Sequence, residues 1–161
     1  SKMEVTPLIA YLSGGMENAQ NEGADWRSDM TNWLKGNLGH DTIDPVLESK
    51  KIVLAHGAEE YQDWKITNHE KYKAFIRLFI NQDLRAVTGR VDYLIVLWDE
   101  SILYGGGTHG EVTMAYWVDR PIFLVNKLPK EKLSGWISSC STETFDSFDE
   151  LKKALLTEFQ S

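Results

Sequence analysis

Residues 91–115, VDYLIVLWDESILYGGGTHGEVTMA, decide the fold class of this chain. The stretch begins with an apolar, β-rich run ending at Trp98, which predicts a buried strand. Two acids follow, and then a glycine-rich loop, residues 105–110, with a helix predicted to open on Glu111. Glycines let a ligand approach the backbone closely, and ligands bind at the carboxyl ends of parallel strands. The stretch therefore predicts a pocket with a charged nucleophile or base beside it.

Short apolar runs alternate with helical patterns along the rest of the chain. Strands are predicted at residues 8–12, 40–44, 91–98, 121–125 and 142–145. Helices are predicted at residues 24–38, 64–87, 110–118 and 148–159. Residues 46–62 show no clear period and are interpreted as a mobile loop. This alternation predicts an α/β fold with a doubly wound parallel sheet, flavodoxin-like or Rossmann-like, in a single domain over residues 1–161.

Composition excludes several classes of protein. The net charge of −7 argues against a nucleic-acid polymer as partner. Cys140 is the only cysteine, so no internal disulfide is possible and a reducing cytoplasm is expected. No apolar stretch approaches the length of a membrane helix, and the first residues lack the apolar core of a signal peptide.

Two acids are the main catalytic candidates. A carboxylate at Glu111, in the first turn of its helix, would be favoured in its ionised form by the helix dipole. The alternative is an acid that only stabilises the start of the helix. Asp83 falls within the apolar helical stripe that contains Phe79 and Ile80. An acid on a buried face is costly unless it is partnered or functional, although a local hydrogen bond or bend would also explain it.

Polar residues at the ends of strands predict a binding edge. Tyr11, Ser13, Gly14 and Gly15 close the first strand, while Asp44 and Asp99 follow the second and third. The carboxyl ends of parallel strands share one edge with Glu111. The alternatives are a core tyrosine, a tight glycine turn and ordinary turn acids.

Other motifs are weaker. Gly105, Gly107 and Gly110 match the dinucleotide fingerprint G-x-G-x-x-G, but late in the chain, and Lys127 rather than an acid ends the next strand. The four histidines show no metal-ligand spacing with one another or with Cys140. We therefore expect neither a metal nor a cofactor.

Taken together, these residues resemble the nucleoside 2-deoxyribosyltransferase family and the related deoxynucleoside monophosphate N-hydrolases. The resemblance covers nearly the whole chain. Its pieces are IAYLSGGM with Tyr11, Trp26-Arg27, Asp44-Pro45, Asn81-Gln82-Asp83-Leu84, and Gly107-Thr108-His109-Gly110-Glu111 with Ala115.

The resemblance implies a mechanism. Glu111 would match the nucleophile that attacks the anomeric carbon and forms a glycosyl-enzyme, which a second base or water then resolves. Asp83 would match the acid that protonates the departing base, and Tyr11 the tyrosine that positions the nucleophile. Gly107 and Thr108 would belong to the binding motif. Relatives form homo-oligomers in which a neighbouring subunit completes the pocket, and Ser141 is the candidate for that role.

The substrate predicted from this resemblance is a deoxynucleoside together with a free nucleobase. The hydrolase branch that reads a 5′-phosphate tends to carry an arginine soon after the first glycine turn, where this chain has Met16, Glu17 and Asn18. Glu17 would repel a phosphate. Residues 46–62 are expected to close over the base, because long loops are often lids.

Two alternatives stay open. Phosphoribohydrolases carry a GGxGTxxE motif, which Gly105, Gly107, Thr108 and Glu111 fit in part, with Tyr104 in place of the first glycine. A non-catalytic nucleotide-binding module would bind the ligand without cleaving it.

Overall fold

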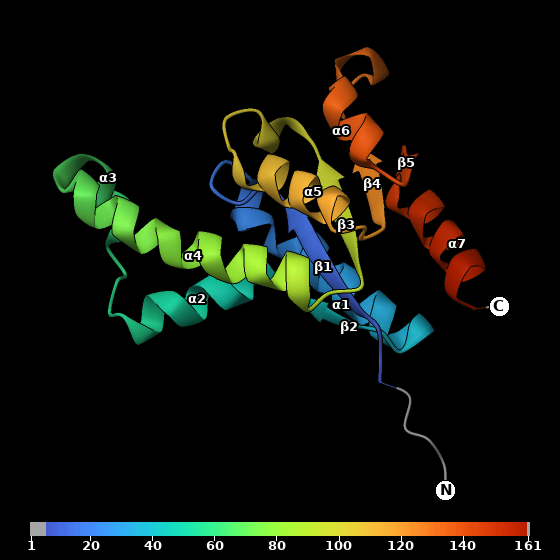
Figure 1. Cartoon of the computed structure of the whole chain (residues 1–161), viewed down its shortest axis with the longest axis horizontal. Coiled ribbons are helices and arrows are strands. Elements are labelled where there is room, and N and C mark those ends of the chain that lie inside the picture. The colour runs from blue at the N-terminus through green and yellow to red at the C-terminus, as the bar shows by residue number, and fades with distance from the viewer. Residues whose placement is uncertain (1–5, 161) are drawn as a thin grey trace, which may run out of the picture.

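The computed structural model describes residues 6–160 and contains a five-stranded sheet with helices on both faces (Figure 1). Across the sheet the strands are β2 (Asp41–Ile43), β1 (Ile9–Gly14), β3 (Tyr93–Trp98), β4 (Ile122–Asn126) and β5 (Glu143–Phe145). Every neighbouring pair is parallel, so the carboxyl ends of all five lie along one edge. The predicted doubly wound parallel α/β fold is confirmed.

Helices cover the two faces of this sheet. One face packs against α4 (His69–Gly89), α5 (Gly107–Trp117) and α6 (Gly135–Cys140). The other packs against α1 (Ala24–Leu38) and α7 (Phe148–Phe159). A separate cluster of buried apolar side chains results on each face.

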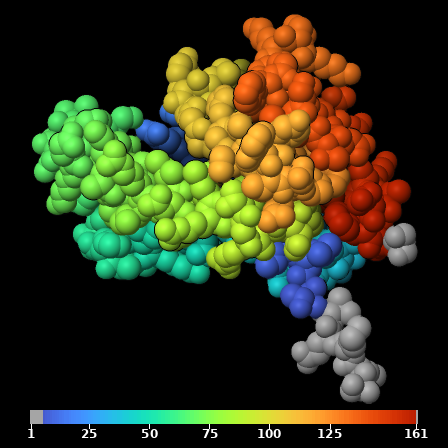
Figure 2. Space-filling view, in the orientation of Figure 1, coloured from blue at the N-terminus to red at the C-terminus, as the bar shows by residue number. Residues whose placement is uncertain are grey.

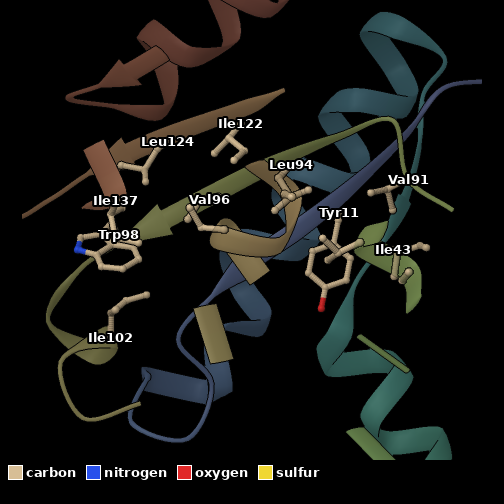
Figure 3. Packing of buried hydrophobic residues seen from close by; sticks show 14 residues of the cluster. Tyr11, Ile43, Val91, Leu94, Val96, Trp98, Ile102, Ile122, Leu124 and Ile137 are labelled. Carbon is tan, nitrogen blue, oxygen red and sulfur yellow. The ribbon is translucent and has the colours of Figure 1, made fainter. Parts of the chain in front are cut away.

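The alternation of side chains along β1 decides what faces α5. Ala10 and Leu12 point into the α1 and α7 layer, whereas Tyr11 joins the cluster under α4 and α5. The Tyr11 ring packs in that cluster and its hydroxyl points out of it (Figure 3). Ser13, two residues on, lies on the same side of the strand.

Two helices have the bounds predicted from sequence. Helix α1 buries Met30 and Leu34 on one stripe and ends at Gly39, whose φ of 67° is left-handed. Helix α7 buries Leu151 and Leu155, and the side chain of Ser147 accepts a hydrogen bond from the Glu150 amide at its start. The bounds of both helices could be predicted because each has a regular apolar stripe and a residue that ends or caps it.

The predicted loop over residues 46–62 is wrong, because helix α2 (Pro45–Ala55) occupies most of it. The Asp44 carboxylate caps this helix by accepting from the Val46 amide at 2.9 Å, and proline stands at its first position. Its apolar residues Leu47 and Leu54 are exposed, so no helical stripe marks it. The lid predicted from a long loop therefore loses its basis.

The long helix predicted over residues 64–87 is two helices, α3 (Trp64–Thr67) and α4. Asn68 interrupts the run with non-helical backbone, and its side chain accepts from the Lys71 amide at 3.2 Å. Sequence periodicity passed over this cap because apolar and aromatic residues continue on both sides of it.

The first half of α4, with α2 and α3, extends away from the sheet as an arm (Figure 1). The arm has its own small aromatic cluster around Phe75, which is 6% exposed. The rings whose centroids lie within about 6 Å of Phe75 belong to His56, Tyr61, Trp64 and Phe79. One ion pair, between Lys65 and Glu17 at 3.2 Å, joins the arm to the loop that follows β1.

Helix α6 was not predicted. It is a short helix in which the Ser134 hydroxyl accepts from the Ile137 amide, and it is too short to show a period. Within residues 6–160, no helix combines the length and the apolar character needed to cross a membrane.

Candidate active site

Glu111 lies in the second turn of α5. The helix begins at Gly107, so its first turn holds no acid, and the prediction that it opens at Gly110 on Glu111 is wrong. The start of α5 was not predicted correctly because Gly107 and Gly110 are poor helix formers. Because the dipole effect falls off within the first turn, it favours an ionised Glu111 less than expected.

Two hydroxyls of β1 hold the Glu111 carboxylate instead. The Tyr11 hydroxyl donates to Oε2 at 2.7 Å, and the Ser13 hydroxyl donates to Oε1 at 2.6 Å. Each carboxylate oxygen therefore has one donor from the strand. Glu111 is 7% exposed, so little solvent reaches this residue.

The charge state of Glu111 reflects opposing effects. Burial raises the pKa of Glu111, since a charged group loses solvation in the interior. The hydrogen bonds from Ser13 and Tyr11 oppose that rise, and so does the positive charge of Arg27. Both bonds and the charge favour the ionised form that a nucleophile needs.

Asp83 on α4 has the complementary character. Burial raises the pKa of Asp83 to about 8, and the negative charge of Glu111 adds to the rise. The charges of both carboxylates act on Tyr11. Its pKa is raised mainly by burial and further by Glu111 and Asp83. At neutral pH Asp83 therefore holds a proton, and beside it Glu111 has a pKa that burial raises and that its two hydroxyl donors and Arg27 lower.

The two glycines after Ser13 are required by close packing. A Cβ at Gly15 would lie 2.0 Å from the Ser101 Oγ, and one at Gly14 would lie 2.9 Å from the Trp26 ring. A side chain at either position would force neighbouring elements apart. The role of these glycines is therefore more than a tight turn. They let the end of β1 pack closely against Trp26 of α1 and against Ser101 after β3.

Asp44 and Asp99 lie at the carboxyl edge but make local bonds. Asp44 caps α2, as described above, and Asp99 accepts from both the amide and the hydroxyl of Ser101. These contacts agree with the alternative of turn acids, although each carboxylate keeps an oxygen without a protein donor among the described contacts.

Gly107 and Thr108 form the first turn of α5. Thr108 is buried. A Cβ at Gly107 would meet no atom within 4 Å, so space remains beside this turn. That space lies at the edge where the resemblance implies ligand contacts.

Ser141 lies away from this group in the chain. It follows α6 and donates to the Ile137 carbonyl at 2.9 Å. Its neighbour Thr142 bonds to Ile122, the first residue of β4, at the amino edge of the sheet. Within one chain, Ser141 is therefore at the opposite edge from the ends of β1 and β3.

Arg27 is a site residue whose role sequence reasoning missed. It is completely buried beside the end of β1, although it appeared above only as part of a motif. The available signal was its spacing, since Arg27 lies three and seven residues before Met30 and Leu34 on the buried stripe of α1. The same reasoning, a charge on an apolar face, had identified Asp83.

A cavity of about 270 Å³ lies at the ends of β1 and β3 and is lined in part by Gly15, Asp99 and Ser101. The residues that line it do not include Tyr11, Ser13, Asp83 or Glu111. In the space-filling view a hollow lies between the green arm and the gold loop before α5, with the blue segment after β1 at its floor (Figure 2). A larger cavity of about 430 Å³ lies at the amino edge, and no predicted site residue lines it.

Within the described residues, no group of three or more His, Cys, Asp or Glu side chains could hold a metal ion. A scan of the chain against protein-family models finds no match, and a search of curated proteins finds no significant similarity. The family resemblance therefore stays a prediction from the residues themselves.

Proposed function

We propose that this protein cleaves the N-glycosidic bond of 2′-deoxynucleosides and transfers the deoxyribose to another base or to water. The observation that carries the proposal is the pairing of a buried Glu111, bonded by Tyr11 and Ser13, with an Asp83 whose pKa is raised to about 8. One carboxylate is prepared to attack and the other to give a proton.

The steps follow from these two states. A Glu111 oxygen bonds to the anomeric carbon while the bond from that carbon to the base nitrogen breaks. Asp83 gives its proton to the departing base. A nitrogen of a second base, or water, then attacks the same carbon while the bond from that carbon to the Glu111 oxygen breaks. The attacking group loses its proton to Asp83, so Glu111 is released as a carboxylate and Asp83 is protonated again.

A second candidate substrate is the deoxynucleoside 5′-monophosphate. Glu17, expected to repel a phosphate, pairs with Lys65 at 3.2 Å, and both side chains are exposed. Lys65 thus brings a positive charge to the loop after β1 and weakens the repulsion. This contact supports the branch of the family that binds a 5′-phosphate as an alternative. Turnover of a ribonucleotide would instead identify the phosphoribohydrolase alternative.

We also propose a homo-oligomer. Tyr116 and Trp117 at the end of α5 are exposed, as is Trp136 on α6. The Trp136 indole donates to the Thr113 hydroxyl at 3.0 Å, so α5 and α6 present one aromatic face. In such an assembly Ser141 would approach the neighbour's pocket. The single cysteine favours a reducing compartment such as the cytoplasm.

Incubation of the protein with each deoxynucleoside and a free second base, followed by chromatography, tests the proposal. A new nucleoside shows transfer, and free base alone shows hydrolysis. A deoxyribosyl adduct on Glu111, found by mass spectrometry of quenched protein, would identify the intermediate. Binding of a nucleoside without any cleavage would favour the non-catalytic module, and faster turnover of the monophosphate would move the assignment to the hydrolase branch.

A further inference from the structure

Arg27 is a buried arginine whose guanidinium is bonded to backbone carbonyls at each of its three nitrogens. Its side chain is 0% exposed. Its guanidinium donates to five backbone carbonyls, at distances from 2.9 to 3.4 Å. These carbonyls belong to Leu12, Gly14, Gly15, Glu22 and Gly23. Nε and Nη2 each serve one carbonyl, whereas the two N–H groups of Nη1 are shared among three. A lysine ammonium carries its three N–H groups on a single nitrogen and lacks this planar spread.

The five carbonyls come from the two ends of one loop. Leu12 and Gly14 flank Ser13 at the end of β1. Glu22 and Gly23 end the short turn before α1, where three successive residues have left-handed backbone, with φ of 49° at Asn21, 55° at Glu22 and 76° at Gly23. Such a conformation persists only where its surroundings hold it. The guanidinium thus ties a strained turn to the strand that carries Ser13.

Arg27 also supplies charge. Among the lysines and arginines of residues 6–160, it is the one that is buried. The groups that act on it are Asp44, Glu111, Tyr11 and Asp83, from four different elements. An arginine stays protonated even when burial lowers its pKa, so this positive charge is permanent.

We propose that Arg27 is a positioning residue: it holds the loop after β1 so that Ser13 stays bonded to Glu111, and it places a fixed positive charge beside both carboxyls. As a statement about the reaction this rests on the proposed function. As a statement about the two carboxyls it needs no substrate: it stands on the carbonyl contacts on either side of Ser13 and on the positive charge that acts on both carboxyls.

A pair of glycine variants tests the positioning without altering any charged group. In Gly23→Ala the new Cβ would lie 2.3 Å from the Arg27 Nη1 and 2.7 Å from the Gly15 oxygen. Gly39→Ala is the matched control, because Gly39 lies at the other end of α1 with φ of 67° and a Cβ there would meet nothing within 4 Å. Both variants place alanine in left-handed backbone, but only the first displaces the guanidinium.

We expect Gly23→Ala to lower kcat roughly 100-fold, as a small misplacement of a reacting group does, while Gly39→Ala stays within about twofold of the wild type. Equal kcat values for the two variants, each folded by circular dichroism, would overturn the positioning role.

Two arginine variants test the charge. Arg27→Met removes the charge, and Arg27→Lys keeps it while losing most of the carbonyl contacts. Titration of the Glu111 and Asp83 carboxyls by carbon-13 NMR should show higher pKa values for both in Arg27→Met, since the positive charge lowers both in the wild type. Glu111 and Glu48, the acids whose charges raise the pKa of Asp83, are both kept in this comparison.

Arg27→Lys should give smaller rises in both pKa values. Unchanged titrations in a folded Arg27→Met protein would overturn the charge role. If that variant does not fold, Arg27→Gln, which also removes the charge, takes its place, and unchanged titrations there would likewise overturn the charge role.

Failure of the proposed function is separable from failure of this inference. A wild-type protein that cleaves no nucleoside, nucleotide or ribonucleotide would remove the proposed reaction. The carboxyl titrations of wild type, Gly23→Ala and Arg27→Met need no substrate. They would still show whether the guanidinium changes the pKa values of Glu111 and Asp83.

Discussion

The Tyr11 hydroxyl donates to the Glu111 carboxylate at 2.7 Å, although 100 residues separate them in the chain. The contact exists because Tyr11 points from β1 toward α5, and Glu111 faces the sheet from the second turn of that helix. It joins the first strand to the glycine-rich segment that follows the third.

Replacement of Glu111 separates chemistry from folding. Glu111→Gln keeps the size of the side chain and should lower kcat by at least about 10³-fold, because the amide is no nucleophile. Glu111→Ala should lose the same activity and also destabilise the fold by about 1–3 kcal/mol, since the hydroxyls of Tyr11 and Ser13 lose their acceptor. Steady-state kinetics and thermal melts check both; an active Glu111→Ala protein would exclude the mechanism.

Loss of the Tyr11 hydroxyl should change the acidity of Glu111. In Tyr11→Phe the ionised form of Glu111 loses one donor, so the acidic limb of the kcat/KM profile should move up by about one to two pH units. Tyr93→Phe is the matched control, because it removes another buried hydroxyl, bonded to His40 at 2.7 Å, on the α1 and α7 side of the sheet. A profile that moves equally in both variants would contradict a specific role for Tyr11.

Asp83 should control the alkaline side of the rate profile. Because the pKa of Asp83 in the free protein is raised to about 8, the wild-type kcat/KM should fall above that pH as the acid loses its proton. Asp83→Asn cannot donate in this way, so its profile should be lower at neutral pH and lack the alkaline limb. Persistence of that limb in the variant would assign it to another group.

The same carboxyl should make stability depend on pH. The folded protein holds the Asp83 proton up to about pH 8, whereas an unfolded aspartate loses it near pH 4. Asp83 therefore favours folding fully below about pH 4, and this contribution is lost as the pH rises toward 8. Since solvent partly reaches Asp83, the change should be on the order of 2 kcal/mol, less than full linkage would give.

Asp83→Asn removes this dependence. Denaturant unfolding at pH 4 and pH 8 should show the variant gaining stability relative to the wild type at the higher pH. A constant difference between the two proteins across that range would contradict the raised pKa.

The aromatic face of α5 and α6 should control assembly. Trp117→Glu places a charge on a side chain that is 78% exposed, and should reduce the mass seen by light scattering to that of one chain. Leu54→Glu is the control, because Leu54 is also exposed but lies on α2 in the arm. A wild-type protein that is already a monomer at working concentration would remove the prediction.

Sequence reasoning succeeded where one physical signal dominated. The sheet was predictable because its central strands are continuous apolar runs, and α1 and α7 because each has a regular buried stripe. Helix α2 was missed because Leu47 and Leu54 face solvent, which removes the stripe. The break at Asn68 was missed because a cap inside an apolar run leaves the period almost unchanged.

The site was predictable in part for similar reasons. Tyr11, Ser13 and Glu111 were placed at one sheet edge by topology, and the structure brings them into contact. The role of Arg27 was not predicted because its hydrogen-bond partners are backbone carbonyls, which leave no signature in the sequence. The charge states of Glu111 and Asp83 also depend on burial, which follows from packing between distant segments.

The aromatic cluster around Phe75 has a consequence for how proteins of this fold diverge. Because the arm is held by its own rings, substitutions there alter one wall of the hollow while leaving the sheet and the hydrogen bonds of Glu111 unchanged. For the proposed reaction, substitutions in the arm would then change which base is accepted, while the contacts of Glu111 with Tyr11 and Ser13 stay the same.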